Sequence, residues 1–173
     1  VSAPVSASAI VVMGVSGCGK STVAAALADR IGGRYTDADD LHSDEARAKM
    51  AAGIPLTDED REPWLQRVAA LIQRESNAGV TAVVACSALR RRYRDLLREH
   101  SGVGLFFVHL SGSVEMLTAR MTSRSDHFMP ASLLESQLRT LEPLEPEESG
   151  IVIDANDLVE NILERVDAAV SLE

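Results

Sequence analysis

Gly14-Val15-Ser16-Gly17-Cys18-Gly19-Lys20-Ser21 fits the phosphate-binding pattern G-x-x-x-x-G-K-[ST] at every fixed position. The apolar run Ile10-Val11-Val12-Met13 precedes it and predicts a strand, and apolar residues at helical spacing follow it from Ser21 to Ile31. A strand, a glycine-rich loop and a helix in this order are the context that the pattern requires. A chance glycine-rich turn is the alternative, and it is disfavoured because both flanks agree with the motif.

The chemistry of this loop follows from its residue types. Its glycines let successive backbone N–H groups point inward, and the helix that follows adds the positive end of its dipole. Lys20 supplies a mobile positive charge for the outer phosphates, and the Ser21 hydroxyl can ligate magnesium. The predicted nucleotide-binding residues are Gly14, Ser16, Gly17, Cys18, Gly19, Lys20, Ser21 and Thr22.

Composition bounds the class of protein. The 173 residues are 46% hydrophobic and 25% charged, which is ordinary for one globular domain. A net charge of −9 argues against a nucleic-acid partner, and no apolar run approaches the length that spans a membrane. Two cysteines suggest neither a disulfide framework nor a zinc site, which favours the cytoplasm. We expect a disordered tail over residues 1–8 and a single domain over 9–173.

Strand-like apolar runs alternate with amphipathic stretches along the chain. This alternation predicts an α/β fold of three layers, with a five-stranded, mostly parallel sheet and helices on both faces. Ligands of such sheets collect at the carboxyl ends of the strands. The expected strands are Ala9–Met13, Arg34–Thr36, Thr81–Cys86, Gly104–Leu110 and Gly150–Ile153, and the expected helices are Ser21–Ile31, Asp44–Ala52, Asp58–Asn77, Arg90–Glu99, Ser113–Met121, Ala131–Leu141 and Asp157–Val170.

The second expected strand ends in Asp37-Ala38-Asp39-Asp40-Leu41-His42, which holds three carboxylates and an imidazole. A solvated, Asp-rich loop that caps a helix is the simpler interpretation. The functional interpretation is a magnesium ligand together with a base that accepts the proton of a substrate hydroxyl. Asp37 and Asp39 both fit these two roles, and the residue pattern alone does not separate them.

The third expected strand ends in Cys86-Ser87-Ala88-Leu89. Many phosphate-loop proteins place a magnesium-binding Asp after such a strand, and this chain has none there. Metal binding must then rest on Ser21 and the loop of Asp37 and Asp39. Ser87 offers a neutral donor to a polar substrate. Arg90 and Arg94 share one helical face, which we expect to look into the site, although a solvated helix face would give the same spacing.

Arg120 and Arg124 stand four residues apart and are followed by Ser125-Asp126-His127-Phe128-Met129-Pro130. Two arginines on one helical face before such a loop predict a lid, over about residues 120–140, that closes over the nucleotide and supplies charge in the transition state. Surface arginines near a helix C-terminus are the alternative, since the helix dipole favours them there.

With these residues in place, the chain resembles the gluconokinases, small phosphate-loop kinases related to shikimate and nucleoside monophosphate kinases. The resemblance runs from about Ile10 to Val170. Its most specific blocks are Pro55-Leu56-Thr57-Asp58-Glu59-Asp60-Arg61-Glu62-Pro63-Trp64-Leu65 and Cys86-Ser87-Ala88-Leu89, supported by Tyr93-Arg94-Asp95, His127-Phe128 and Gln137 through Pro143.

The resemblance implies the transfer of phosphate from ATP to D-gluconate, with magnesium, by a cytoplasmic homodimer. Lys20, Asp39, Arg120 and Arg124 would then be catalytic, and Ser21 and Asp37 would hold the metal. The substrate hydroxyls would meet Asp37, Asp39, His42 and Ser87, and the substrate carboxylate would meet Arg61, Arg94 or His127.

Two alternative functions fit the sequence motifs less well. A shikimate kinase has a Gly-rich turn where this chain has Cys86-Ser87-Ala88-Leu89. A nucleotide-binding switch of the GTPase kind needs an N-K-x-D motif, and this chain has none.

Overall fold

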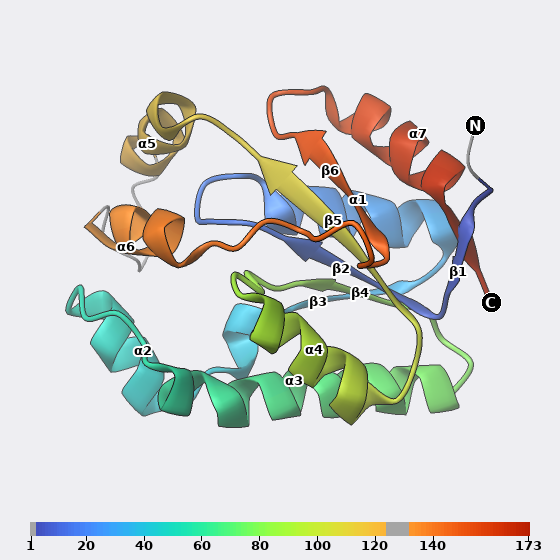
Figure 1. Ribbon diagram of the computed structural model, residues 1–173, viewed down its shortest axis with the longest axis horizontal. Helices are drawn as coiled ribbons and strands as arrows, with labels where there is room; N and C mark the ends of the chain where they lie inside the picture. The colour runs from blue at the N-terminus through green and yellow to red at the C-terminus, as the bar shows by residue number, and fades with distance from the viewer. Residues whose placement is uncertain (1–2, 124–131) are drawn as a thin grey trace.

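A computed structural model describes residues 3–123 and 132–173. It has three layers, with a sheet between two groups of helices (Figure 1). The sheet has five parallel strands in the order β3-β4-β2-β5-β6. The strands are β2 (Ala9–Met13), β3 (Arg34–Asp37), β4 (Ala82–Ala85), β5 (Leu105–Ser111) and β6 (Gly150–Asp154). All five expected strands are confirmed, with ends that differ by one residue at most.

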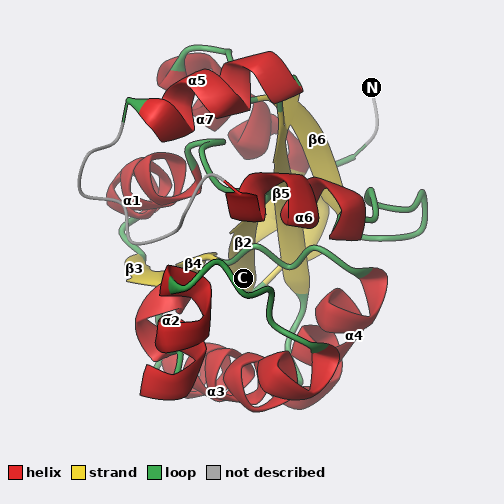
Figure 2. Cartoon of the chain, turned by 90° about the vertical axis from the view of Figure 1, so that its left-hand side faces the viewer, coloured by secondary structure: helices red, strands yellow, loops and turns green. Residues whose placement is uncertain are grey.

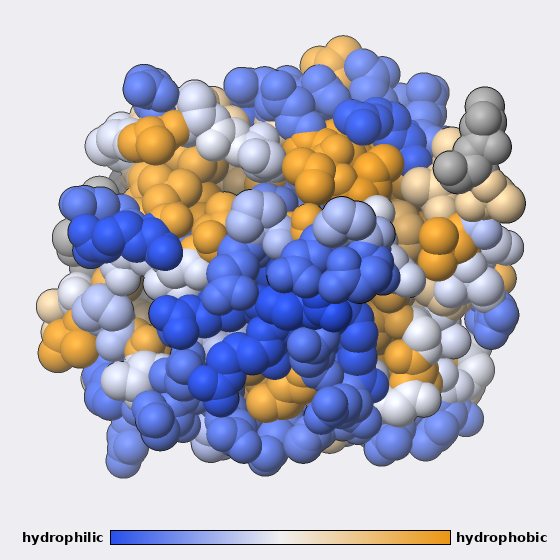
Figure 3. All heavy atoms as spheres, viewed as in Figure 1, coloured by the Kyte–Doolittle hydropathy of each residue, from blue (hydrophilic) through white to orange (hydrophobic). Residues whose placement is uncertain are grey.

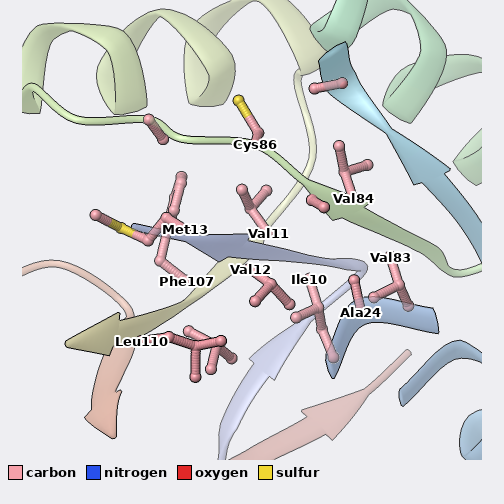
Figure 4. Packing of buried hydrophobic residues seen from close by; sticks show 14 of the residues in the cluster. Ile10, Val11, Val12, Met13, Ala24, Val83, Val84, Cys86, Phe107 and Leu110 are labelled. Atoms are coloured by element: carbon pink, nitrogen blue, oxygen red, sulfur yellow. The ribbon is translucent and has the colours of Figure 1, made fainter. Parts of the chain in front are cut away.

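The strands in the middle of the sheet are covered on both faces. Every residue of β2 is fully buried, as are Val83 and Val84 of β4 and Phe107 and Val108 of β5. Figure 4 shows Val83, Val84 and Phe107 packed around β2, with Ala24 contributed by the first helix. Strands buried on both faces read as continuous apolar runs rather than alternating ones, which is why the sequence revealed them.

Helices α1 and α7 lie on one face of the sheet, and α3 and α4 lie together on the other (Figure 1). Helix α3 begins with a capping box, in which the Thr57 hydroxyl accepts from the Asp60 N–H and the Asp60 carboxylate accepts from the Thr57 N–H. The helices are α1 (Lys20–Ile31), α2 (Asp44–Ala51), α3 (Asp58–Asn77), α4 (Arg91–Ser101), α5 (Val114–Thr122), α6 (Ser132–Thr140) and α7 (Val159–Ala169), so all seven expected helices are present within two residues at each end.

The carboxyl ends of the strands point toward one edge of the molecule, where α2, α5 and α6 gather (Figure 1). Figure 2 looks onto this edge. Strand β2 pairs with β4 on one side and β5 on the other, and the chain leaves β2 toward β3 before it returns to β5. The end of β2 is therefore a topological switch point, where α/β sheets place their ligands.

The expected disordered tail is wrong in part. Residues Val5–Ala7 form strand β1, which pairs in parallel with β7 (Val170–Leu172) at the other end of the chain. Ala7 and Val170 are buried, and the Glu173 N–H donates to the Ala7 carbonyl. Three-residue strands carry no detectable periodicity, so only the tertiary structure reveals this pair. Among the described residues, no helix is both long enough and apolar enough to cross a membrane.

Candidate nucleotide and acceptor site

The glycine-rich loop between β2 and α1 has a backbone that only glycine adopts easily. Gly14 has a φ of 141°, and a Cβ there would lie 2.8 Å from both the Cys18 Sγ and the Leu110 carbonyl oxygen. Gly19 has a φ of 96° and precedes α1, and no side chain caps the first turn of that helix. The N–H groups at this helix end are therefore oriented for an anion.

Lys20 and Ser21 follow at the start of α1. The Lys20 ammonium folds back on its own loop, donating to the Val15 carbonyl at 3.1 Å and lying 4.0 Å from the Cys18 Sγ. The Ser21 hydroxyl donates to the Asp37 carboxylate at 2.9 Å, so the two residues expected to hold a metal lie side by side.

The pair of Ser21 and Asp37 fits a hard divalent cation. Both residues offer oxygen ligands, and the Asp37 carboxylate also accepts from the Asp39 N–H at 3.0 Å, which fixes its orientation. Within residues 3–123 and 132–173, no cluster of three or more His, Cys, Asp or Glu side chains could hold a metal by itself. A cation here would then complete its shell with phosphate and water oxygens.

A pocket opens beside the glycine-rich loop and gathers side chains from distant parts of the chain. Asp39 and His42 follow β3, Arg61 lies on α3, and Ser87 follows β4. The structure thus brings together four of the residues expected to contact substrate. Among residues 3–123 and 132–173, the lining of the pocket is Ser16, Lys20, Asp39, His42, Met50, Pro55, Leu56, Arg61, Trp64, Ser87, Leu89, Leu133, Ser136 and Gln137. We call it the acceptor pocket.

His42 stacks on Trp64 in the wall of this pocket, with ring centroids 4.1 Å apart and planes at 18°. Trp64 is held in turn by a hydrogen bond from its Nε1 to the Ala38 carbonyl at 2.7 Å. Burial lowers the pKa of His42 to about 4, with help from the charges of Arg47, Arg67 and Arg61, so this imidazole is neutral at pH 7. Its Nδ1 is buried and has no hydrogen-bond partner in the described structure.

Arg61 is held by α4. It donates to the Tyr93 hydroxyl at 2.9 Å and lies 5.3 Å from the centre of that ring. Tyr93 donates in turn to Asp58. The Arg61 guanidinium is thereby oriented at the pocket wall, where a cation can meet a carboxylate.

The expectation that Arg94 faces the site is wrong. Its side chain is completely buried and forms an ion pair with Glu148, with Nε 2.7 Å from a carboxylate oxygen. Its remaining donors go to backbone carbonyls, so the guanidinium is committed to the interior, and Arg94 does not line the acceptor pocket. Arg90, expected on the same face, lies 3.5 Å from Asp58.

Arg120 lies over the opposite side of the glycine-rich loop. Its guanidinium donates to the Gly17 and Cys18 carbonyls at 3.3 Å and to the Ala155 carbonyl at 3.0 Å. Arg124 and His127 lie outside the described residues. A second pocket beside Arg120 is lined by Cys18, Gly19, Thr22, Val23, Arg120, Ala155, Asp157, Val159 and Ile162.

Three features of the acceptor pocket were missed in the sequence. The Gln137 side chain on α6 accepts from the Ser16 N–H at 2.8 Å, which docks α6 on the glycine-rich loop. Leu133 and Ser136 of the same helix line the pocket, as does Trp64. Trp64 could have been suspected, because it is the single tryptophan of the chain and lies in a specific block of the resemblance.

Comparisons with known proteins agree with this geometry. A family model described as adenylylsulphate kinase matches residues 6–124. A gluconokinase from Gluconobacter oxydans is 44% identical over 157 residues, covering 91% of this chain and 88% of the relative.

Two solved structures are also similar. A sugar kinase from Janibacter sp. HTCC2649 superposes with a TM-score of 0.87 at 48% identity, covering 95% of this chain and 99% of the other. A gluconokinase from Sinorhizobium meliloti 1021 superposes with a TM-score of 0.78 at 46% identity, covering 92% and 89%. The glycine-rich loop, the parallel sheet and these relatives together show that the chain belongs to the gluconokinase family of P-loop kinases.

Proposed function

We propose that this chain transfers the γ-phosphoryl group of ATP to the 6-hydroxyl of D-gluconate, giving 6-phosphogluconate and ADP. The observation that carries the proposal is the acceptor pocket. It joins Lys20 of the phosphate loop to a carboxylate, Asp39, and a guanidinium, Arg61, across one cavity. Such a cavity suits a polyol that carries a carboxylate.

At the nucleotide end, the N–H groups of the glycine-rich loop and the Lys20 ammonium receive the β- and γ-phosphates. Arg120 lies against this loop, where it can neutralise charge that develops during transfer. Mg²⁺ held by Ser21 and Asp37 would supply further charge neutralisation on the phosphates when it is bound.

At the acceptor end, Asp39 orients the hydroxyl that attacks and accepts its proton. Ser87 and the neutral His42 are hydrogen-bond partners for the other hydroxyls. Arg61 is the best-supported anchor for the substrate carboxylate, because Arg94 is committed to Glu148 and His127 lies outside the described residues.

A coupled assay of ADP release across a panel of acceptors tests the proposal. The panel contains gluconate, related sugar acids, neutral sugars, shikimate, AMP and adenosine 5′-phosphosulphate, the last because of the family model that matches the chain. We expect turnover with gluconate and none with the nucleotides. Absence of gluconate-dependent turnover, or a larger kcat/KM for adenosine 5′-phosphosulphate, would contradict the proposal.

A cytoplasmic homodimer is the assembly and compartment that the resemblance implies. The two cysteines, Cys18 and Cys86, are both free and buried, which suits a reducing compartment. Light scattering coupled to size exclusion tests the oligomer, and a monomer at micromolar concentration would contradict the dimer.

A further inference from the structure

The short segment between β4 and α4 contains a strained residue. Ala88 has a φ of 43°, and within residues 3–123 and 132–173 it is the one residue other than glycine with a positive φ. Residues with a Cβ pay a free-energy cost for this left-handed conformation, which persists only where surrounding contacts enforce it. The neighbours on either side, Ser87 and Leu89, both line the acceptor pocket.

Arg94 contacts the carbonyl of this strained residue, Ala88. Its NH1 group donates to the Ala88 carbonyl at 3.0 Å and to the Glu142 carbonyl at 3.1 Å. Its Nε and NH2 groups bind the two oxygens of the Glu148 carboxylate at 2.7 and 2.9 Å. The two-pronged ion pair fixes the plane of the guanidinium, and its remaining N–H groups then bind the Ala88, Glu142 and Pro143 carbonyls.

The same segment is tied at both ends. The Gly14 N–H of the phosphate loop donates to the Ser87 carbonyl at 3.3 Å, and the Glu142 N–H donates to the Leu89 carbonyl at 2.7 Å. The connection between α6 and β6, which carries Glu142 and Glu148, crosses the front of the molecule in Figure 1. A hydrophilic area covers this part of the surface in Figure 3, so the buried ion pair lies beneath a hydrophilic exterior.

Glu148 is held as firmly as its partner. It also accepts from Arg98 at 2.7 Å and from the Glu145 N–H at 2.8 Å. Burial acts to raise the pKa of Glu148, but the hydrogen bonds from Arg94, the Glu145 N–H and Arg98 outweigh it and lower that pKa to about 2. The carboxylate is therefore ionised wherever the protein is folded near neutral pH.

We infer that Arg94 is a positioning residue for the acceptor: anchored by Glu148, it holds Ala88 in the left-handed conformation and thereby sets Ser87 and Leu89 in the pocket wall. The inference rests on the proposed function for the identity of the acceptor. The Arg94 side chain bonds Glu148 and the carbonyls of Ala88, Glu142 and Pro143, and its link to the phosphate loop runs through the Ser87 carbonyl, which accepts from the Gly14 N–H. We therefore expect its main effect to fall on acceptor binding.

The test uses the double variant Arg94→Met with Glu148→Gln, which leaves no unpaired buried charge and keeps an acceptor for Arg98. We expect kcat/KM for the acceptor to fall about 10- to 100-fold, as for a misplaced binding group, while the KM for ATP changes less than about twofold. Arg94→Lys keeps the positive charge but loses the two-pronged geometry of the guanidinium. Its kcat/KM for the acceptor should therefore lie between those of the double variant and the wild type. Equal losses for ATP and acceptor, or an unchanged kcat/KM for the acceptor, overturn the inference.

Arg98→Met is the matched control, since Arg98 bonds the same Glu148 oxygen but no atom of the segment from Ser87 to Leu89. It should leave both KM values within about twofold of the wild type. Adding Ala88→Gly to the double variant should restore part of the acceptor affinity, because glycine adopts a positive φ without the strain that Arg94 opposes. If the acceptor affinity does not recover, the inference is overturned.

Amide hydrogen exchange over residues 83–93 gives a readout that needs no acceptor. Exchange there should be faster in the double variant than in Arg98→Met, and equal rates overturn the inference. If the wild type prefers another acid from the panel, the ratios of variant to wild-type kcat/KM are measured with that acid. Loss of gluconate turnover in the wild type thus overturns the proposed function alone.

Discussion

At the scale of single residues, burial decides whether His42 in the acceptor pocket carries a charge. His42 is neutral near pH 7 because burial, together with the charges of Arg47, Arg67 and Arg61, lowers its pKa to about 4. It therefore contributes hydrogen bonds to the pocket and no positive charge. In the described part of the lining, the remaining cations are Lys20 on the phosphate side and Arg61 on the acceptor side, so each can be tested separately.

Lys20→Met should remove the charge that meets the outer phosphates. We expect kcat to fall about 10²- to 10³-fold, as when one electrostatic donor is lost from an active site, with little change in thermal stability. The ADP-release assay measures this. Lys49→Met is the control, because Lys49 pairs with Asp60 outside the pocket, and its kcat should stay near that of the wild type. Near-normal turnover of Lys20→Met would contradict the assignment.

Asp39→Asn should remove the base and lower kcat by about 10²- to 10⁴-fold. Asp37→Asn should instead raise the Mg²⁺ concentration needed for half-maximal rate, because Asp37 lies against Ser21. Titration of Mg²⁺ at saturating ATP separates the two roles, and Asp40→Asn, at an exposed position in the same loop, serves as the control. A near-normal rate for Asp39→Asn would move the base to Asp37.

At the scale of elements, boundaries were predictable because they are set by local chemistry. Thr57 and Asp60 form a reciprocal cap at the start of α3, and Gly32 and Gly102 end α1 and α4 in the left-handed conformation. These signals lie within a few residues of the ends that they define. The β1–β7 pair has no such signal, because its hydrogen bonds join residues from the two ends of the chain.

Thr57→Ala should destabilise the protein through the start of α3. Loss of the cap costs about 1 kcal/mol in the free energy of unfolding, and urea denaturation measures it. The acceptor KM should rise modestly as well, since Arg61 lies in the first turn after the cap. Thr118→Ala, at an exposed position inside α5, is the control and should change stability by less than about 0.5 kcal/mol. Equal stabilities of the two variants would contradict the role of the cap.

At the scale of the whole molecule, two buried histidines link folding to pH. Burial lowers the pKa of His109 on β5 to about 4, assisted by Arg94 and Lys20, and the pKa of His42 is lowered to a similar value. Between pH 6.5 and 4 the unfolded chain therefore binds protons that the folded chain does not. The contribution of these two histidines to the free energy of unfolding is fully present above pH 6.5 and is lost as the pH falls toward 4.

The free energy of unfolding should then drop on acidification from pH 7 to 4.5, by about 2 kcal/mol per histidine once partial access of water is allowed for. His109→Gln should show a smaller drop than the wild type, because one titrating group is gone. Urea denaturation at intervals of half a pH unit measures the slope, and His100→Gln, at an exposed position on α4, should keep the wild-type slope. A slope in His109→Gln equal to that of the wild type would contradict the linkage.

The sequence by itself determined the phosphate loop, the five parallel strands, the seven helices and the convergence of Asp39, His42 and Ser87 on one edge, and the family resemblance added Arg61. Local spacing carries this information, because apolar runs and caps define elements and parallel strands bring their carboxyl ends together. It also specified the family through blocks that span most of the chain.

Only the tertiary structure decided where individual side chains point. Arg61 and Arg94 looked equivalent as cations for a carboxylate, yet Arg94 turns inward to Glu148, which lies 54 residues away in the chain. Gln137 reaches the phosphate loop across 121 residues, and the chain ends meet across the β1–β7 pair. A buried charged side chain must pair with an opposite charge. Long-range packing determines which residue provides that charge, so the spacing of residues along the chain does not reveal it.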